Sequence, residues 1–111
     1  MINTQKIHDK VIINLKKVFD PEIPVNIYDL GLVYNIGLFE KNHITHCHIL
    51  MTLTSPACPV AESLIEQARL VTKVIDEIDE VTIELTFNPP WDKDKMSEEG
   101  KDILMVSGAV I

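Results

Sequence analysis

Apolar residues recur at helical spacing in two long segments of the chain. The first segment runs from about Thr4 to Val18, and one stripe collects its larger apolar side chains: Ile7, Val11, Leu15 and Val18. The second begins with Pro59 at its first helical position and runs to about Asp79, with a comparable stripe: Ala61, Leu64, Ile65, Ala68, Val71, Ile75 and Ile78. This spacing predicts two amphipathic helices. Pro21 ends the first helix because proline has no amide proton and disfavours helical backbone in the preceding residue.

Three shorter segments have the alternation and composition of strands. They run from Gly31 to Phe39, from Ile44 to Thr54 and from Val81 to Phe87. The polar residues 40–43 separate the first two strands, which we expect to pair as a hairpin. In the second strand, one alternating set of side chains is expected to face the core: Thr45, Cys47, Ile49, Met51 and Leu53.

The order of these elements predicts the fold class. A helix between two strands indicates a right-handed crossover, so the second and third strands are expected to run parallel. A short last helix is expected near the C-terminus, with Ser97 as its N-cap and Gly100 as a weak point. The sequence therefore predicts an α+β fold of two layers, in which helices cover a small mixed sheet made of a hairpin and a crossover strand. Residues 1–111 are expected to form a single domain, because two separate cores would each be too small.

The same topology brings three loops to one edge of the sheet. The second strand ends shortly before Cys58, the third ends at Asn88–Trp91, and the first begins at Tyr28–Gly31. Crossover sheets bind their ligands at the carboxyl ends of parallel strands, where side chains from several loops converge. We therefore expect the functional site at this edge, and we expect Trp91 to plug the core there.

Charge and hydropathy exclude several classes of protein. The chain has 10 Lys and Arg against 17 Asp and Glu, a net charge of −7, and no basic run that could neutralise a nucleic-acid backbone. The N-terminus lacks the apolar segment of a signal peptide, and no stretch of about 18 apolar residues could span a bilayer. We expect a cytoplasmic protein with no nucleic-acid partner and no membrane attachment.

The two cysteines stand in different surroundings. Cys58 is expected at the N-cap of the second helix, where backbone amides and the helix dipole favour a thiolate. The alternative is a buried cysteine that takes the place of an N-cap serine. Cys47 alternates with apolar residues in mid-strand and is expected to be a small core side chain. The extended segment after Cys47 separates the two thiols by roughly 26 Å, which is too far for a disulfide.

Several polar side chains are further candidates. Asp20 and Glu22 lie in a proline-stiffened loop on the same edge as the thiol, so they either accept hydrogen bonds there, contact a metal, or simply end the helix as solvated carboxylates. Asp29 is expected to hold the start of the first strand by bonding nearby amides. His46 and His48 share the exposed sheet face but lack further ligands nearby, so a metal site there is not expected.

Three segments of the sequence together resemble a known family. DPEIPVNIYDLGLVY (residues 20–34), MTLTSPACP (51–59) and NPPWDKDKMSEEGK (88–101) are similar, in the same order, to the signatures of the metal-sulfur cluster biosynthesis family. That family includes SufT, the PaaD-like proteins and eukaryotic cytosolic iron-sulfur assembly factors. The resemblance covers nearly the whole chain and implies an iron-sulfur cluster assembly domain-like fold, with a role in maturing or delivering iron-sulfur clusters.

The resemblance also implies which residues form the site. The reactive cysteine of the family falls on Cys58, which would contact the metal, and the acidic element falls on Asp20 and Glu22. Asp29 and Thr54 match neighbouring motif positions. The extra C-terminal cysteines of PaaD-type proteins are absent, which disfavours a zinc-bearing tail and leaves a short, SufT-like form.

Ligand counting defines the expected function. Iron-sulfur clusters usually take four protein ligands, mostly thiolates, and this chain offers one. We therefore expect transient cluster transfer or client adaptation, with iron-sulfur assembly proteins and apo-client proteins as partners. The remaining ligands would come from a homodimer, a small thiol, or the donor or client. Two alternatives stay open: a pure protein-interaction module, and a cysteine-dependent thiol enzyme. The enzyme is disfavoured because no histidine is expected beside the thiol as a base.

Overall fold

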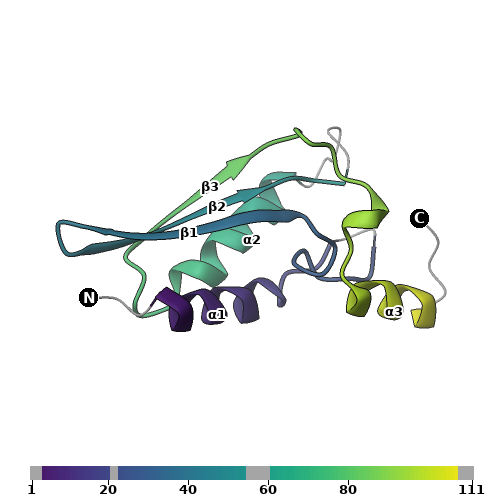
Figure 1. Ribbon diagram of the computed structural model, residues 1–111, viewed down its shortest axis with the longest axis horizontal. Coiled ribbons are helices and arrows are strands. Elements are labelled where there is room, and N and C mark those ends of the chain that lie inside the picture. The colour runs from purple at the N-terminus through teal and green to yellow at the C-terminus, as the bar shows by residue number, and fades with distance from the viewer. Residues whose placement is uncertain (1–3, 21–22, 55–60, 108–111) are drawn as a thin grey trace.

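The computed structural model describes residues 4–20, 23–54 and 61–107. The helices and strands follow one another as α1 (Thr4–Leu15), β1 (Val33–Lys41), β2 (Ile44–Met51), α2 (Ala61–Lys73), β3 (Glu80–Leu85), the short 3-10 helix η1 (Lys93–Lys95) and α3 (Glu98–Ser107). The strands form one sheet in the order β1-β2-β3, with β1 antiparallel and β3 parallel to β2 (Figure 1). The predicted mixed sheet, built from a hairpin and a crossover strand, is therefore confirmed.

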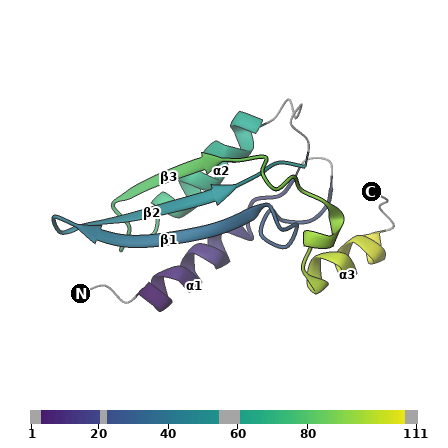
Figure 2. The ribbon, with the colours of Figure 1, turned by 45° about the horizontal axis from the view of Figure 1, so that its top comes forward.

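The two layers are visible from two directions. Helices α1 and α2 cover one face of the sheet, and the other face is open (Figures 1 and 2). The predicted inner face of the central strand β2 and its extension is buried, with at most 4% of any residue exposed: Thr45, Cys47, Ile49, Met51 and Leu53. This confirms the core assignment made from the alternating pattern.

The polar segment between β1 and β2 makes a two-residue turn. Asn42 and His43 both adopt positive φ angles, 54° and 66°, which is the backbone of a tight hairpin turn that matches the twist of the strands. Asparagine tolerates this left-handed conformation better than most residues do. The predicted hairpin is confirmed, and β1 extends to Lys41, two residues further than expected.

Both long helices are shorter than the apolar periodicity predicted. Helix α1 ends at Leu15 and α2 at Lys73, although Val18, Ile75 and Ile78 beyond them are buried. Val18 lies beyond the end of the helix, and its backbone carbonyl accepts a hydrogen bond from the Ile27 amide (2.8 Å) and not from another helical turn. Buried apolar residues that follow a helix thus continue its periodicity in the sequence, and the predicted helix end falls too late. At 12, 13 and 10 residues, no helix in the described ranges is long and apolar enough to cross a membrane.

Candidate functional site

Two of the three predicted loops meet at the expected edge of the sheet. The indole Nε1 of Trp91 donates to the carbonyl of Leu30 (2.6 Å), and the hydroxyl of Tyr34 donates to the carbonyl of Pro89 (2.7 Å). Burial raises the pKa of Tyr34, so its hydroxyl stays a neutral donor at physiological pH. Trp91 is half-buried and packs against the core, as expected of a plug. Residues 55–60, which include Cys58, lie outside the described residues.

Asp29 occupies the centre of a buried hydrogen-bond cluster. Its carboxylate accepts from Nδ2 of Asn26 (2.7 Å) and from the hydroxyl of Ser97 (2.8 Å). The side-chain oxygen of Asn26 in turn accepts from the Asp29 amide (2.9 Å), and the Asp29 carbonyl accepts from the Ser97 amide (2.8 Å). The expectation that the carboxylate bonds nearby amides is met by the side-chain amide of Asn26, and its second donor is the hydroxyl of the distant Ser97. The carboxylate links the start of β1 to a segment almost 70 residues further along the chain.

The same cluster starts helix α3. Ser97 accepts a hydrogen bond from the Gly100 amide (3.0 Å) through its hydroxyl, which confirms the predicted N-cap. Gly100 is buried, and a Cβ added there would lie 2.8 Å from the carbonyl oxygen of Asp29. The glycine that the sequence marks as a weak point of the helix is thus what allows the helix to approach the Asp29 loop.

A second glycine allows the neighbouring close approach. Gly31 has a φ of 81°, and a Cβ at this position would collide with the backbone of Lys95 in η1. The loop that ends in Gly31 and the segment from η1 into α3 therefore pack backbone to backbone at the site edge.

Asp20 is buried, with 5% of the residue exposed. One carboxylate oxygen accepts a hydrogen bond from the Ile23 amide (3.0 Å), and the Asp20 amide donates to the carbonyl of Val25 (3.3 Å). Among the readings left open by the sequence, these contacts support a structural one in which Asp20 shapes the loop. Glu22 lies outside the described residues, so its role stays a prediction.

Thr54 lies half-buried, three residues beyond the end of β2. The chain there continues from Thr52, whose amide donates to the carbonyl of Leu32 (2.8 Å) at the beginning of β1. The last described residues before the Cys58 segment are thus tied to the site edge. A direct role for Thr54 stays a prediction.

Cys47 is a core side chain, as predicted. It is 1% exposed, and burial raises the pKa of its thiol to about 11. A thiol that is inaccessible and protonated at physiological pH cannot serve as a metal ligand, because ligation requires the thiolate. Cys47 is therefore not a candidate ligand, and the ligand role of Cys58 stays a prediction.

The histidines of β2 belong to the open face of the sheet. The ring of His46 stacks on Phe39 with 4.8 Å between ring centroids, and Nε2 of His48 lies 3.0 Å from a carboxylate oxygen of Glu84. Within the described ranges, no three His, Cys, Asp or Glu side chains gather closely enough to hold a metal ion.

Asn26 and Ser97 are the members of the site edge that sequence reasoning did not place there. Asn26 stands three residues before Asp29. Asparagine side chains often bond backbone amides a few residues further on in turns, so the sequence did contain a signal for this contact. Ser97 was identified as a cap, but its contact with Asp29 depends on how distant segments fold together.

Known proteins with similar sequence and structure give a consistent result. A sequence profile described as "Iron-sulfur cluster assembly protein" matches residues 8–85. An "Fe-S protein maturation auxiliary factor" of Porphyromonas gingivalis is 48% identical over 85 residues, which span 77% of this chain and 78% of the relative. The "Fe-S protein maturation auxiliary factor SufT" of Staphylococcus aureus is 39% identical over 90 residues, 81% of this chain and 99% of the relative. A crystal structure of a "Domain of Unknown Function DUF59" from Bacillus anthracis superimposes with a TM-score of 0.82 at 35% identity, covering 92% of this chain and 94% of that one.

Proposed function

Because the chain belongs to the iron-sulfur cluster assembly protein family and has a role in iron-sulfur protein maturation, we propose that it acts as a transient transfer factor or client adaptor. In this proposal the transferred cluster is the cargo, and Cys58 is the single ligand from this chain that binds it and then releases it. The partners are iron-sulfur assembly proteins on one side and apo-client proteins on the other.

The burial of Cys47 is the observation that supports this proposal most directly. With 1% of the residue exposed and a pKa near 11, this thiol is unavailable in the folded protein. One remaining thiol cannot supply the four ligands that a cluster usually needs. The chain is therefore suited to share a cluster with a donor, a client, a small thiol or a second copy, and not to store it.

The architecture of the site edge supports the same function. The buried Asp29 carboxylate is engaged by Asn26 and Ser97, and Asp20 accepts from a backbone amide. We assign both carboxylates to shaping the loops around the Cys58 segment. Hydrogen bonds that fix a loop reduce the conformational entropy lost when a partner binds there.

The rival thiol enzyme has less support from the described residues. A nucleophilic cysteine normally needs a base beside it, most often histidine. His8 lies on α1 and His43 in the hairpin turn. His46 and His48 lie in β2, on the open face of the sheet, which is opposite the core. His8 shares a hollow with Tyr28 and Tyr34 at the site edge, whereas the other three histidines do not line the described part of that edge.

Anaerobic reconstitution of matched cysteine variants tests the proposal. Wild-type protein loaded with iron and sulfide is expected to activate an apo-client enzyme, and Cys58→Ser is expected to lower the transfer rate at least about tenfold, because thiolate ligation is lost. The matched control Cys47→Ala, which removes the core thiol, is expected to keep the wild-type rate once folding is verified by circular dichroism.

A cluster that stays in a monomer with full occupancy, and that Cys58→Ser leaves unchanged, would overturn the transfer mechanism. Equal transfer by Cys58→Ser and wild type, without stable binding, would instead favour the pure interaction module. Sedimentation analysis of the loaded protein tests whether a second copy supplies the remaining ligands, and fractionation of cells tests the predicted cytoplasmic location.

A further inference from the structure

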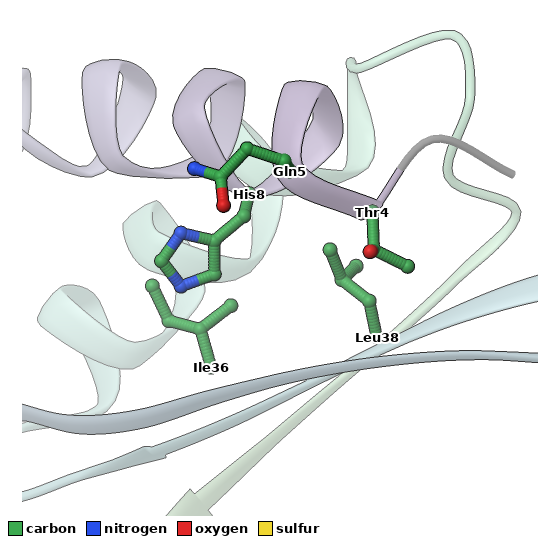
Figure 3. A pocket seen from close by; sticks show the side chains of 5 residues that line it. All are labelled: Thr4, Gln5, His8, Ile36 and Leu38. Atoms are coloured by element: carbon green, nitrogen blue, oxygen red, sulfur yellow. The ribbon is translucent and has the colours of Figure 1, made fainter.

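A groove runs between helix α1 and the edge strand β1. Two hollows make up this groove, and they share His8 and Ile36. The first has a volume of about 290 Å³ and is lined by Thr4, Gln5, His8, Ile36 and Leu38 (Figure 3). The second, of about 170 Å³, continues past His8 along β1 and is lined by Tyr28, Val33, Tyr34 and Asn35 as well. The groove thus extends from Leu38 to the site edge at Tyr34.

The floor of the groove is apolar and its wall is polar. The ring of His8 points from α1 toward Ile36, with Thr4 and Leu38 further along (Figure 3). Ile36 and Leu38 lie on the same side of the sheet as the core, yet both stay partly exposed. The buried stripe of α1, formed by Ile7, Val11 and Leu15, packs into the core and leaves these two side chains incompletely covered.

The segment that forms one side of the groove, residues 4–17, is basic in an acidic protein. It contains four lysines and a single carboxylate, Asp9, a net charge of +3 against −10 for the rest of the chain. Lys10 forms an ion pair with Glu77 and lines a different hollow, so its charge does not face the groove. Asp9 accepts a hydrogen bond from Gln5 (3.0 Å), and none of the described residues that line the two hollows is Asp or Glu. At the inner end, Nζ of Lys16 lies 5.6 Å from the ring centroid of Tyr28. The groove therefore favours a partner of negative charge.

Strand β1 also offers an unpaired edge. It pairs with β2 on one side, and no described strand pairs with its other side. Over its nine residues it contains no proline, and its only charged residues are Glu40 and Lys41 at the hairpin end. An exposed strand edge of this kind is a template for the addition of another strand. The pairing of β1 with β2 shifts register between Val33 and Asn35, so the regular part of this lining, residues 35–38, would pair with roughly four residues of extended peptide at about 3.3 Å per residue.

We propose that this groove binds an extended, acidic segment of a partner protein, which adds to β1 as a fourth strand. The partner's backbone pairs with β1, alternate aliphatic side chains rest on Ile36 and Leu38, and its carboxylates lie near His8 and Lys16. The charges of Glu40 and Lys41 offset each other at the hairpin end, so Lys16 directs the acidic side chains toward Tyr28. The bound segment leads to Tyr34 and hence to the site edge. The inference goes beyond the proposed function, since it does not depend on Cys58.

A synthetic peptide of about eight alternating valine and glutamate residues tests this surface. Fluorescence anisotropy is expected to show saturable binding that weakens with salt, and a peptide with lysine in place of glutamate is expected to bind at least about tenfold more weakly. Amide NMR shifts are expected at residues 5–8 and 33–38, and alternate amides of β1 are expected to exchange more slowly when the peptide is bound.

Two adjacent lysines provide a matched pair of variants. Lys16→Glu reverses a charge beside the groove and is expected to weaken binding at least about fivefold. Lys17→Glu makes the same change at the next residue, which is exposed and which no described contact places against Tyr28, and is expected to have less than a twofold effect. Cys58→Ser is expected to bind the peptide like wild type, so a failure of cluster transfer leaves this test intact.

Several results would overturn the proposal. Equal binding of the acidic and basic peptides, an equal loss in both lysine variants, or shifts centred outside the groove would each do so. Protection of the β1 amides that rises with protein concentration in the absence of peptide would show that a second copy is the occupant.

Discussion

Ser97→Ala is the substitution whose effect follows most directly from the described contacts. The Ser97 hydroxyl donates to the buried Asp29 carboxylate (2.8 Å) and accepts from the Gly100 amide (3.0 Å). Helix α3 lies at one end of the molecule, away from α1 and α2 (Figure 1). Its start is attached to the body through this serine and the Asp29 loop, so the loss should affect α3 far more than the sheet.

The magnitude can be worked out from the two bonds. Loss of an N-cap side chain costs about 1 kcal/mol, and loss of one donor to a buried carboxylate costs about 1 to 2 kcal/mol. If the two costs add, the opening of α3 becomes more favourable by about 2 to 3 kcal/mol, which corresponds to roughly a 30- to 150-fold larger open population.

Native-state hydrogen exchange, read by NMR, measures this opening residue by residue. The amides of α3 are expected to exchange faster by that factor, while those of β2 stay within about threefold of wild type, because the core is untouched. Ser97→Thr keeps the hydroxyl and should restore most of the protection. Ser63→Ala is the matched control, since the Ser63 hydroxyl accepts a hydrogen bond from Gln67 on the exposed face of α2 and bonds no other described residue.

The reasoning would be refuted by an increase of less than about threefold in α3, because a cap and a buried acceptor together must cost more than that. Equal acceleration in α3 and β2 would also refute it. That result would mean that α3 opens only when the whole domain unfolds, and that Ser97 is not a local attachment.

Two further predictions concern burial. Gly100→Ala should lower the free energy of unfolding by about 1 to 3 kcal/mol, because its Cβ would lie 2.8 Å from the Asp29 carbonyl; Gly37→Ala, with 3.8 Å to its nearest neighbour, should be neutral or stabilising. Denaturant titrations of both variants measure this, and destabilisation of equal size would contradict it. Burial raises the pKa of Cys47 from 9.0 to about 11 and so favours the neutral thiol in the fold; this stabilisation is complete below pH 9 and is lost as the pH rises toward 11. Denaturation at pH 8 and pH 10.5 should show a larger loss for wild type than for Cys47→Ala, and equal losses would disprove the assignment.

Local sequence patterns determined the elements and their inner faces. The stripe of Ile7, Val11 and Leu15 and the alternation of Cys47 and Ile49 are set by the helical and strand periods, and these residues are buried as predicted. The crossover between β2 and β3 followed from chain connectivity and handedness. The family resemblance, found in three short segments, led to iron-sulfur protein maturation, whereas the role of Cys58 as ligand stays a prediction.

Only the tertiary structure decided the contacts between distant segments. Helix ends were predicted too far along the chain, because an apolar residue such as Val18 or Ile78 is buried equally well in a helix or in the turn after it. The bonds of Asp29 could not be assigned because its partner Ser97 is far away in sequence. The groove beside β1 depends on the position of α1 relative to an edge strand. Periodicity fixes which side of an element faces inward, whereas the spacing between two elements is decided by how all their side chains pack together.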